Sequence, residues 1–282
     1  MLTLTRQSLL LVCAIVGVAA VDACENGAAR APNPTRYAWP DSFAYRLEYA
    51  AETQRGQEVV SRFDKAKVLH LAIRNDRYLV WNDDLSSVIE RPGGPARTQP
   101  VYPEDTLRHF VKLGRRGQFE SVVPECDPTV GACRSALPSA VPLELRHIIP
   151  QLALWWPPRN HDWTDTLRFD DLPRPGGARG SVVIVYRVPG DTALGGRRYW
   201  IVDWHSVERA WRPEGGRMVP DPVLEERGNV LVDKGRLLPA YAQWYGVVPA
   251  TPALRAAGVT GTGFRARAWL VGTQFDSLEA ER

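Results

Sequence analysis

The stretch GFRARAWLVGTQF, residues 263–275, shows the pattern that most of this chain follows. The even-numbered residues from Phe264 to Leu270 are apolar, and the residues between them are Arg265, Arg267 and Trp269. Successive side chains of a β-strand point to opposite faces, so this alternation predicts a strand that buries one of its faces.

Many other segments alternate in the same way, such as FAYRLEYAAE (43–52), where Tyr45, Leu47 and Tyr49 share a face. Strands are predicted at 43–52, 58–63, 66–73, 77–81, 86–90, 163–170, 181–188, 197–205, 206–212, 223–233, 237–247 and 263–275. Turn residues divide them at Asn82-Asp83-Asp84, 173–177, Pro189-Gly190-Asp191, Glu214-Gly215-Gly216 and Asp233-Lys234-Gly235.

Two segments carry helical signals instead. In residues 102–114, a proline and two acidic residues precede apolar residues at helical spacing, and Gly114 ends the pattern. In PLELRHII (142–149), three apolar residues share one helical face before Pro150. We therefore predict a mainly β fold with α+β character. It consists of one or more curved antiparallel sheets of long meandering strands, with two or three short helices between the halves.

The N-terminus has the layout of a secretory signal. Arg6 precedes an apolar run of 14 residues, Ser8 to Val21, that ends in small residues. Fourteen helical residues span about 21 Å, less than the roughly 30 Å hydrocarbon core of a membrane. We expect residues 1–23 to be a cleaved signal peptide. An uncleaved anchor stays open as an alternative if the helix extends back to Leu2.

Val21-Asp22-Ala23-Cys24 resembles the lipobox of bacterial lipoproteins, although Asp22 stands where that family has a small uncharged residue. The resemblance implies a diacylglyceryl group on the Cys24 thiol, removal of the signal, and acylation of the new amine, for which palmitate is an expected acyl group. Residues 24–36 would then be a flexible tether. Ordinary signal cleavage after Ala20 or Ala23, giving a soluble secreted or periplasmic protein, is the alternative.

The four cysteines fit export. Cys13 would leave with the signal, and lipidation of Cys24 would leave Cys126 and Cys133 as an even pair. That pair closes a short loop rich in turn residues, for which a local disulfide is the expected state. A metal-binding or redox pair is the alternative, but the two-residue spacing typical of such sites is missing.

Chain length and net charge limit the number of domains and the kinds of partner to expect. Without the signal, 282 − 23 = 259 residues remain, enough for one β-rich globular domain at 37–282 with possible halves 37–135 and 136–282. The net charge of +3 is spread over interspersed residues of both signs, so nucleic acid is not an expected partner.

The order of elements across residues 40–280, together with the lipobox, is similar to the open, curved half-barrels of periplasmic lipoprotein carriers and of uncharacterised envelope lipoproteins. Residues 157–166, in which prolines precede an Asp-Trp strand start, also resemble some of those uncharacterised families. The resemblance implies an envelope location, attachment to a membrane, and binding of something apolar.

No catalytic, phosphate-binding or dinucleotide-binding motif occurs in the sequence. The densest polar cluster contains His161, Asp162 and Asp165, and a second one contains Asp203 and His205. Each could serve acid–base or metal chemistry, or simply form a strand junction or a solvent-facing strand surface. Strand alternation places Asp203 and His205 on one face, about 7 Å apart, with Ser206 on the other, which is poor geometry for a Ser–His–Asp relay.

Tryptophans are the last notable feature, with ten in the chain. Trp155 and Trp156 precede a proline pair, and Trp200 and Trp204 share a strand face. Such residues form sheet cores, and they also line grooves for acyl chains, glycans or peptides.

The sequence therefore favours a lipid-anchored, non-enzymatic envelope protein that binds a hydrophobic ligand or a partner protein, without a cofactor or metal. The alternative is an envelope hydrolase or carbohydrate-acting enzyme with a His/Asp site.

Overall fold

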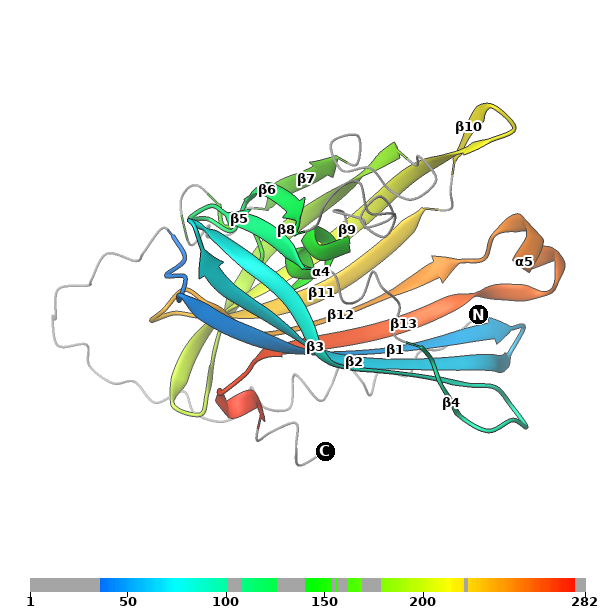
Figure 1. Ribbon diagram of the computed structural model, residues 1–282, viewed down its shortest axis with the longest axis horizontal. Helices are drawn as coiled ribbons and strands as arrows, with labels where there is room; N and C mark the ends of the chain where they lie inside the picture. The colour runs from blue at the N-terminus through cyan, green and yellow to red at the C-terminus, as the bar shows by residue number, and fades with distance from the viewer. Residues whose placement is uncertain are drawn as a thin grey trace, which may run out of the picture. The chain divides into compact units, whose positions relative to one another are not determined.

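Long antiparallel strands dominate the computed structural model and form one curved, open sheet (Figure 1). The structure describes residues 36–100, 108–125, 140–153, 156, 162–168, 179–220 and 223–276. Within this part of the chain, the predicted mainly β fold with a few short helices is confirmed.

The strands are β1 (Ser42–Arg55), β2 (Glu58–Arg74), β3 (Arg77–Glu90), β4 (Arg97–Thr98), β5 (His109–Leu113), β6 (Phe119–Pro124), β7 (Trp163–Arg168), β8 (Arg179–Leu194), β9 (Arg197–Glu214), β10 (Arg217–Pro220), β11 (Leu224–Asp233), β12 (Pro239–Pro249) and β13 (Val259–Leu270). The helices are α4 (Ala140–Ile148) and α5 (Pro252–Ala256), and a single helical turn lies at 274–276. Neighbouring strands follow the order β6-β5-β3-β2-β1-β13-β12-β11-β9-β8-β7, while β4 pairs with β3 and β10 with β9.

The first and last strands pair and thereby join the two meanders into one sheet. Tyr45 lies opposite Leu270, and Ala51 lies opposite Phe264. The alternation predicted for the last strand is confirmed from residue 264 to residue 270. The strand ends at Leu270 rather than at 275, because the chain turns there through Gly272, whose φ is 76°.

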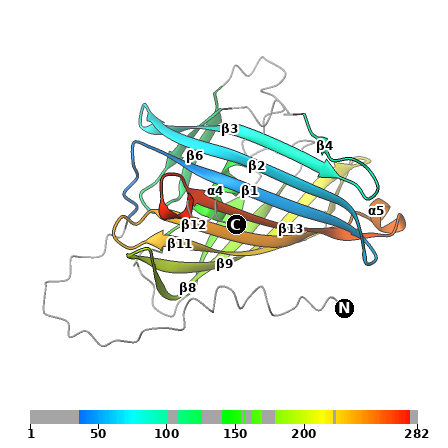
Figure 2. The same cartoon turned by 90° about the horizontal axis from the view of Figure 1, so that it is seen from below.

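The sheet has an inner face, which carries helix α4, and an outer face (Figures 1 and 2). The main hydrophobic core lies on the inner face, and its largest fully buried side chains include Tyr45, Leu69, Ile184 and Tyr186. We call the end of the sheet where β1 begins the near end, and the end where β1 finishes the far end. Because the register is antiparallel throughout, the β2–β3, β5–β6, β8–β9 and β11–β12 turns all lie at the near end.

Two predicted turns are wrong, because their residues lie inside long strands. Asn82-Asp83-Asp84 is part of β3, and Pro189-Gly190-Asp191 is part of β8. In both places the register of strand pairing shifts, so these residues form bulges rather than chain reversals. The predicted breaks after residues 63 and 205 are also wrong, since β2 and β9 run through them. The turns at 214–216 and 233–235 are confirmed.

The helix predicted at 102–114 is wrong where the structure describes it. His109–Leu113 forms strand β5, with Tyr78 of β3 opposite Val111. The apolar spacing suits a helix, but pairing with the neighbouring strand β3 gives Phe110 and Val111 a sheet environment that aromatic and β-branched residues favour. The helix predicted at 142–149 is confirmed as α4.

The residues after α4 connect the two edges of the open sheet. The Leu152 amide donates to the Arg116 carbonyl in the β5–β6 turn, at 2.7 Å. On the other side, the Trp163 indole of β7 donates to the Gln151 carbonyl at 2.6 Å. The two edge strands, β6 and β7, are thus tied together at the near end by residues 151 and 152.

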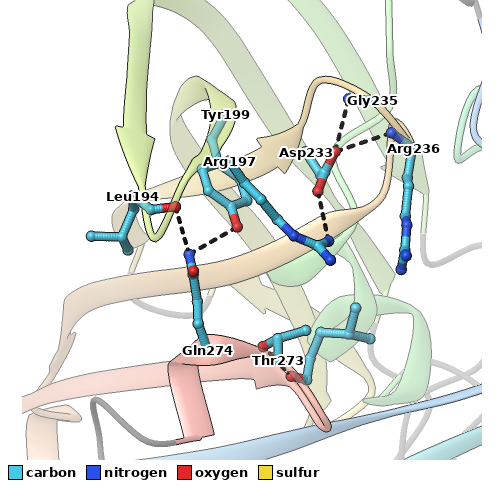
Figure 3. A network of polar contacts seen from close by, with 9 residues as sticks. Leu194, Arg197, Tyr199, Asp233, Gly235, Arg236, Thr273 and Gln274 are labelled. Atoms are coloured by element: carbon cyan, nitrogen blue, oxygen red, sulfur yellow. Dashed lines mark hydrogen bonds and ion pairs between the residues drawn. The ribbon is translucent and has the colours of Figure 1, made fainter.

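A second, smaller apolar cluster lies on the outer face, where the C-terminal turn packs. Trp269 is 3% exposed and packs with Tyr199 and Phe275, and its indole donates to Asp276 at 2.7 Å. Gln274 donates to the Leu194 carbonyl and to the Tyr199 hydroxyl, as Figure 3 shows. This packing explains why a tryptophan stands on the arginine-bearing face of β13.

Candidate functional site

Helix α4 carries three charged or ionisable side chains, and each pairs with a residue of the sheet. Lys67 of β2 reaches both carboxylate oxygens of Glu144 at 2.7 Å. The other two pairs are Arg146 with Asp165 of β7, and His147 with Glu226 of β11. We call these residues, with Ser206, the α4 polar cluster. It fixes the helix to three strands that lie far apart in the sheet order.

The centre of this cluster is the Glu226 carboxylate. His147 Nε2 lies 3.0 Å from Glu226 Oε2, and the Ser206 hydroxyl donates to the same oxygen at 3.2 Å. All three residues are less than a tenth exposed. Burial alone raises the pKa of Glu226, but the charge and hydrogen bond of His147 and the hydrogen bond of Ser206 lower it below its usual value.

Aromatic rings hold His147 in this position. Its ring stacks on Trp204 at a centroid distance of 5.0 Å and an angle of 9°, and it also contacts Trp244 at 5.1 Å. The other side of Trp204 lies against Gly228, where an added Cβ would be 2.7 Å from the indole ring. Only a residue without a side chain lets the indole lie this close to β11.

The order of the three side chains limits their chemistry. In a Ser–His–acid relay the histidine must lie between the hydroxyl and the carboxylate. Here the carboxylate lies between the other two, and Ser206 is 1% exposed. The arrangement therefore suits a structural anchor for α4 rather than a nucleophile.

The second buried pair has a similar role. Arg146 Nε lies 3.0 Å from Asp165 Oδ2, and these side chains are 2% and 11% exposed. Arg146 also donates to the Gly117 carbonyl at 2.9 Å and lies over the Phe119 ring at 4.4 Å. One guanidinium thus joins the β5–β6 hairpin to β7, and so contributes to the connection between the sheet edges.

On the inner face, level with the α4 polar cluster along the strands, β1, β2 and β13 carry aromatic side chains, two of which are partly accessible. Tyr49 stacks on Phe264 at 5.5 Å and meets the edge of Phe63 at 6.0 Å. We call these three residues the aromatic triad. Tyr49 and Phe63 are half-buried, and Val248, on the same face by register, is 43% exposed. Burial and the nearby Glu226 carboxylate raise the pKa of Tyr49 to about 12, so it is neutral at physiological pH.

The sequence-predicted acids separate onto opposite faces. Asp165 faces inwards to Arg146, whereas Asp162 is exposed and lies 3.8 Å from Arg187. Asp203 lies opposite Arg187 in the register of β8 and β9. Burial raises the pKa of Asp203, and Arg187 opposes that rise. Asp162 and Asp203 therefore share one arginine on the outer face, away from Asp165.

His205 lies on the outer face, and the prediction that Ser206 points the other way is confirmed. His205 Nε2 is 3.6 Å from Glu225 Oε2 and the two side chains are partly exposed, whereas Ser206 is buried beneath α4. His161 lies outside the described residues, as do Trp155, Cys24, Cys126 and Cys133. The sites predicted for those residues stay predictions.

The predicted tryptophans that the structure describes are core residues. Trp156 and Trp204 are 6% and 4% exposed, and Trp156 meets the edges of Trp163 and Trp200. Trp200 is partly buried, with the Lys234 ammonium 3.7 Å from its ring centroid. Their indoles pack against the protein itself, which agrees with the core alternative.

No motif in the sequence points to Glu144, Arg146 or Glu226. A usable signal was the composition of α4, in which a nine-residue helix combines an apolar face with Glu144, Arg146 and His147. In a helix held inside a curved sheet, the polar face is buried as well, and its charges require partners.

The described ranges hold neither a metal-binding cluster nor a membrane-spanning helix. No group of three or more His, Cys, Asp or Glu side chains there is arranged to hold a metal ion. Among the same residues, no helix has the length and apolar character needed to cross a membrane.

No family model matches this sequence, and no curated protein matches it. Among solved structures, the chain is similar to a structure of lipid–protein interactions in lipovitellin (TM-score 0.35, 8% identity), over 83% of this chain but only 25% of that one. It is also similar to the hypothetical lipoprotein YmcC from Escherichia coli (TM-score 0.27, 11% identity; 83% and 88% of the two chains). A third similar structure is a protein with a YmcC-like fold from Bacteroides fragilis (TM-score 0.24, 8% identity; 83% and 97%). These TM-scores are low, so the three proteins identify neither a ligand nor a location for this chain.

Proposed function

We propose that this chain is an envelope protein, attached to a membrane through a lipid on Cys24, that binds the apolar part of a ligand on the inner face of its sheet. The observation that carries the proposal is the aromatic triad. Tyr49 and Phe63 stay partly accessible on the inner face, on strands β1 and β2.

The position of α4 limits where a ligand can bind. Near the α4 polar cluster the inner face is filled by the protein's own helix and tryptophans. A ligand would therefore contact only the part of the inner face that α4 leaves accessible, where Tyr49, Phe63 and Val248 offer apolar surface. Each methylene of an acyl chain buried there would contribute about 0.8 kcal/mol.

Mass spectrometry of protein extracted from membranes in mild detergent tests both parts separately. Under denaturing conditions we expect the mass of the chain from Cys24 plus diacylglyceryl and acyl groups, which the Cys24→Ala variant lacks. An unmodified chain would overturn the anchor and leave the ligand part of the proposal to its own test.

In native mode we expect an additional, non-covalent adduct. Tyr49→Ala should remove it, whereas Tyr245→Ala should keep it, because Tyr245 is 55% exposed on the outer face of β12. Both changes remove the same side chain, so general effects of losing a tyrosine cancel. The absence of an adduct, or its equal loss in both variants, would overturn the ligand part.

A further inference from the structure

The turns at the near end of the sheet carry an unusual amount of positive charge. The β2–β3 turn contains Arg74 and Arg77, and the β5–β6 turn contains Arg115 and Arg116. The β8–β9 and β11–β12 turns, residues 194–198 and 233–237, hold two basic residues each as well. The antiparallel register places all four turns at one end of the sheet.

The far end differs. The four near-end turns (74–77, 113–118, 194–198 and 233–237) contain eight basic and two acidic residues, a balance of 8 − 2 = +6. The far-end turns (55–58, 90–97, 214–217 and 250–258) contain five basic and three acidic residues, a balance of 5 − 3 = +2. Asp41 and Asp191 lie at the same end, outside these turns, and lower the near-end balance to 6 − 2 = +4, which still exceeds the net charge of +3 of the whole chain.

Part of this charge is held in place by acidic neighbours. Arg197 lies 3.3 Å from Asp233, as Figure 3 shows, and Arg198 and Lys234 both contact Asp191. Four further arginines of the near-end turns, Arg74, Arg77, Arg115 and Arg236, are exposed.

Two exposed apolar residues lie between the basic turns. Ile73 is 46% exposed and its amide donates to the Asp41 carbonyl. Val271 is 45% exposed and its amide donates to the Ala44 carbonyl, so it lies on the other side of the start of β1. Asp41 and Asp76 are the exposed acids beside them. Basic side chains around a few apolar ones are the chemistry that binds an anionic bilayer surface.

The described chain also starts at this end. Arg36 precedes Tyr37, whose amide donates to the Arg115 carbonyl. Arg36 lies twelve positions after Cys24, and a chain of that length reaches at most about 40 Å. A lipid on Cys24 would thus hold the near end close to the membrane. This last argument rests on the anchor in the proposed function, whereas the charge argument does not.

We propose that the near end of the sheet is a docking surface for an anionic lipid bilayer, with the β2–β3, β5–β6 and β11–β12 turns against the lipid headgroups. The aromatic triad then lies away from that bilayer, in the middle of β1 and β13 and the far half of β2. Bound in this way, the protein presents its ligand-binding face to the space beyond the membrane.

Vesicle co-sedimentation tests this inference on the full-length Cys24→Ala chain, in which binding cannot come from the lipid. The vesicles consist of phosphatidylcholine alone or of phosphatidylcholine mixed with phosphatidylglycerol. The near-end variant changes Arg74, Arg77, Arg115 and Arg236 to Gln. The matched control changes Arg55, Arg91, Arg97 and Arg217 to Gln, which are four exposed arginines of the far-end turns.

Each basic side chain beside an anionic surface strengthens binding by a factor of about five, so the near-end variant should bind mixed vesicles at least about thirtyfold more weakly. The control should bind as the parent does, and added salt should weaken the parent most. All variants contain the apolar run Ser8–Val21, so any insertion of that run into a bilayer adds equally to the binding of each. Binding to vesicles of phosphatidylcholine alone measures this contribution.

Equal losses in the two variants, or equal binding to both vesicle types, would overturn the docking surface. Preference for soluble polyphosphate over vesicles would also overturn it. If mass spectrometry finds no lipid on Cys24 while this vesicle pattern holds, the anchor fails and the docking surface stands.

Discussion

Replacing Gly228 by alanine tests the stack that positions helix α4. A Cβ at this position would lie 2.5 Å from the Gln243 carbonyl oxygen and 2.7 Å from two ring atoms of Trp204. The carbonyl belongs to β12, paired with β11, and cannot move without breaking that pairing. The Trp204 ring is fixed on its other side by His147.

The magnitude follows from these contacts. Overpacking a tight core position typically costs about 1–3 kcal/mol. Because both contacts of the added methyl group are shorter than real Cβ contacts, and one is with backbone, we expect Gly228→Ala to lower the free energy of unfolding by about 3 kcal/mol.

Gly263→Ala is the matched control. Gly263 lies in strand β13, and an added Cβ there would have no atom within 4 Å. Without a clash, alanine restricts the unfolded chain and should be neutral or stabilising by up to about 1 kcal/mol. Urea unfolding, followed by tryptophan fluorescence and by circular dichroism, measures both variants. Equal stabilities of the two variants would refute the reasoning that Gly228 makes room for Trp204.

Four further predictions concern single side chains. Glu226→Gln should flatten the pH dependence of stability. Because the pKa of Glu226 is lower in the folded protein than in the unfolded chain, its carboxylate stabilises the fold fully above the unfolded pKa, and this stabilisation is lost as the pH falls. In urea unfolding between about pH 5 and pH 3, the free energy of unfolding should therefore fall more steeply in the unaltered protein than in the variant. Asp165→Asn should cost about 3 kcal/mol by leaving Arg146 buried without its charge partner. Asp162→Asn, in an exposed pair, should cost less than about 0.5 kcal/mol in the same unfolding assay. Asp276→Ala should release the C-terminal turn and red-shift the fluorescence of Trp269, while an unchanged spectrum would contradict its role as the hydrogen-bond acceptor.

The sequence predicted the strands well because a period of two is a local property. Alternation in 43–52 and 264–270 survives in the structure, since each strand buries one face against the core. The breaks were harder to predict. Turn residues such as Asn82 and Gly190 also suit bulges, and only the pairing with a neighbouring strand decides between a bulge and a reversal.

The site was less predictable, because its residues meet through the sheet. Glu226 and His147 are 79 positions apart, and Lys67 and Glu144 are 77 apart. No local spacing connects them. By contrast, Asp162 and Asp165 are close in sequence and yet face opposite ways, since an odd spacing on a strand places residues on different faces.

The pairing of β1 with β13 has a consequence for the order in which the molecule can form. The middle of the sheet is built from the two ends of the chain, with Tyr45 opposite Leu270. A polypeptide that emerges N-terminus first has already released β1 and β2 long before residues 259–270 follow. Until then, β1 has an open side, and the contact that closes it spans more than two hundred residues. Each meander can pair its own neighbouring strands locally, but joining the two must wait for the last strand, and contacts between residues so distant in sequence form slowly. Until β13 is in place, the open sides of β1 and β12 are two unprotected strand edges in what later becomes the middle of the sheet.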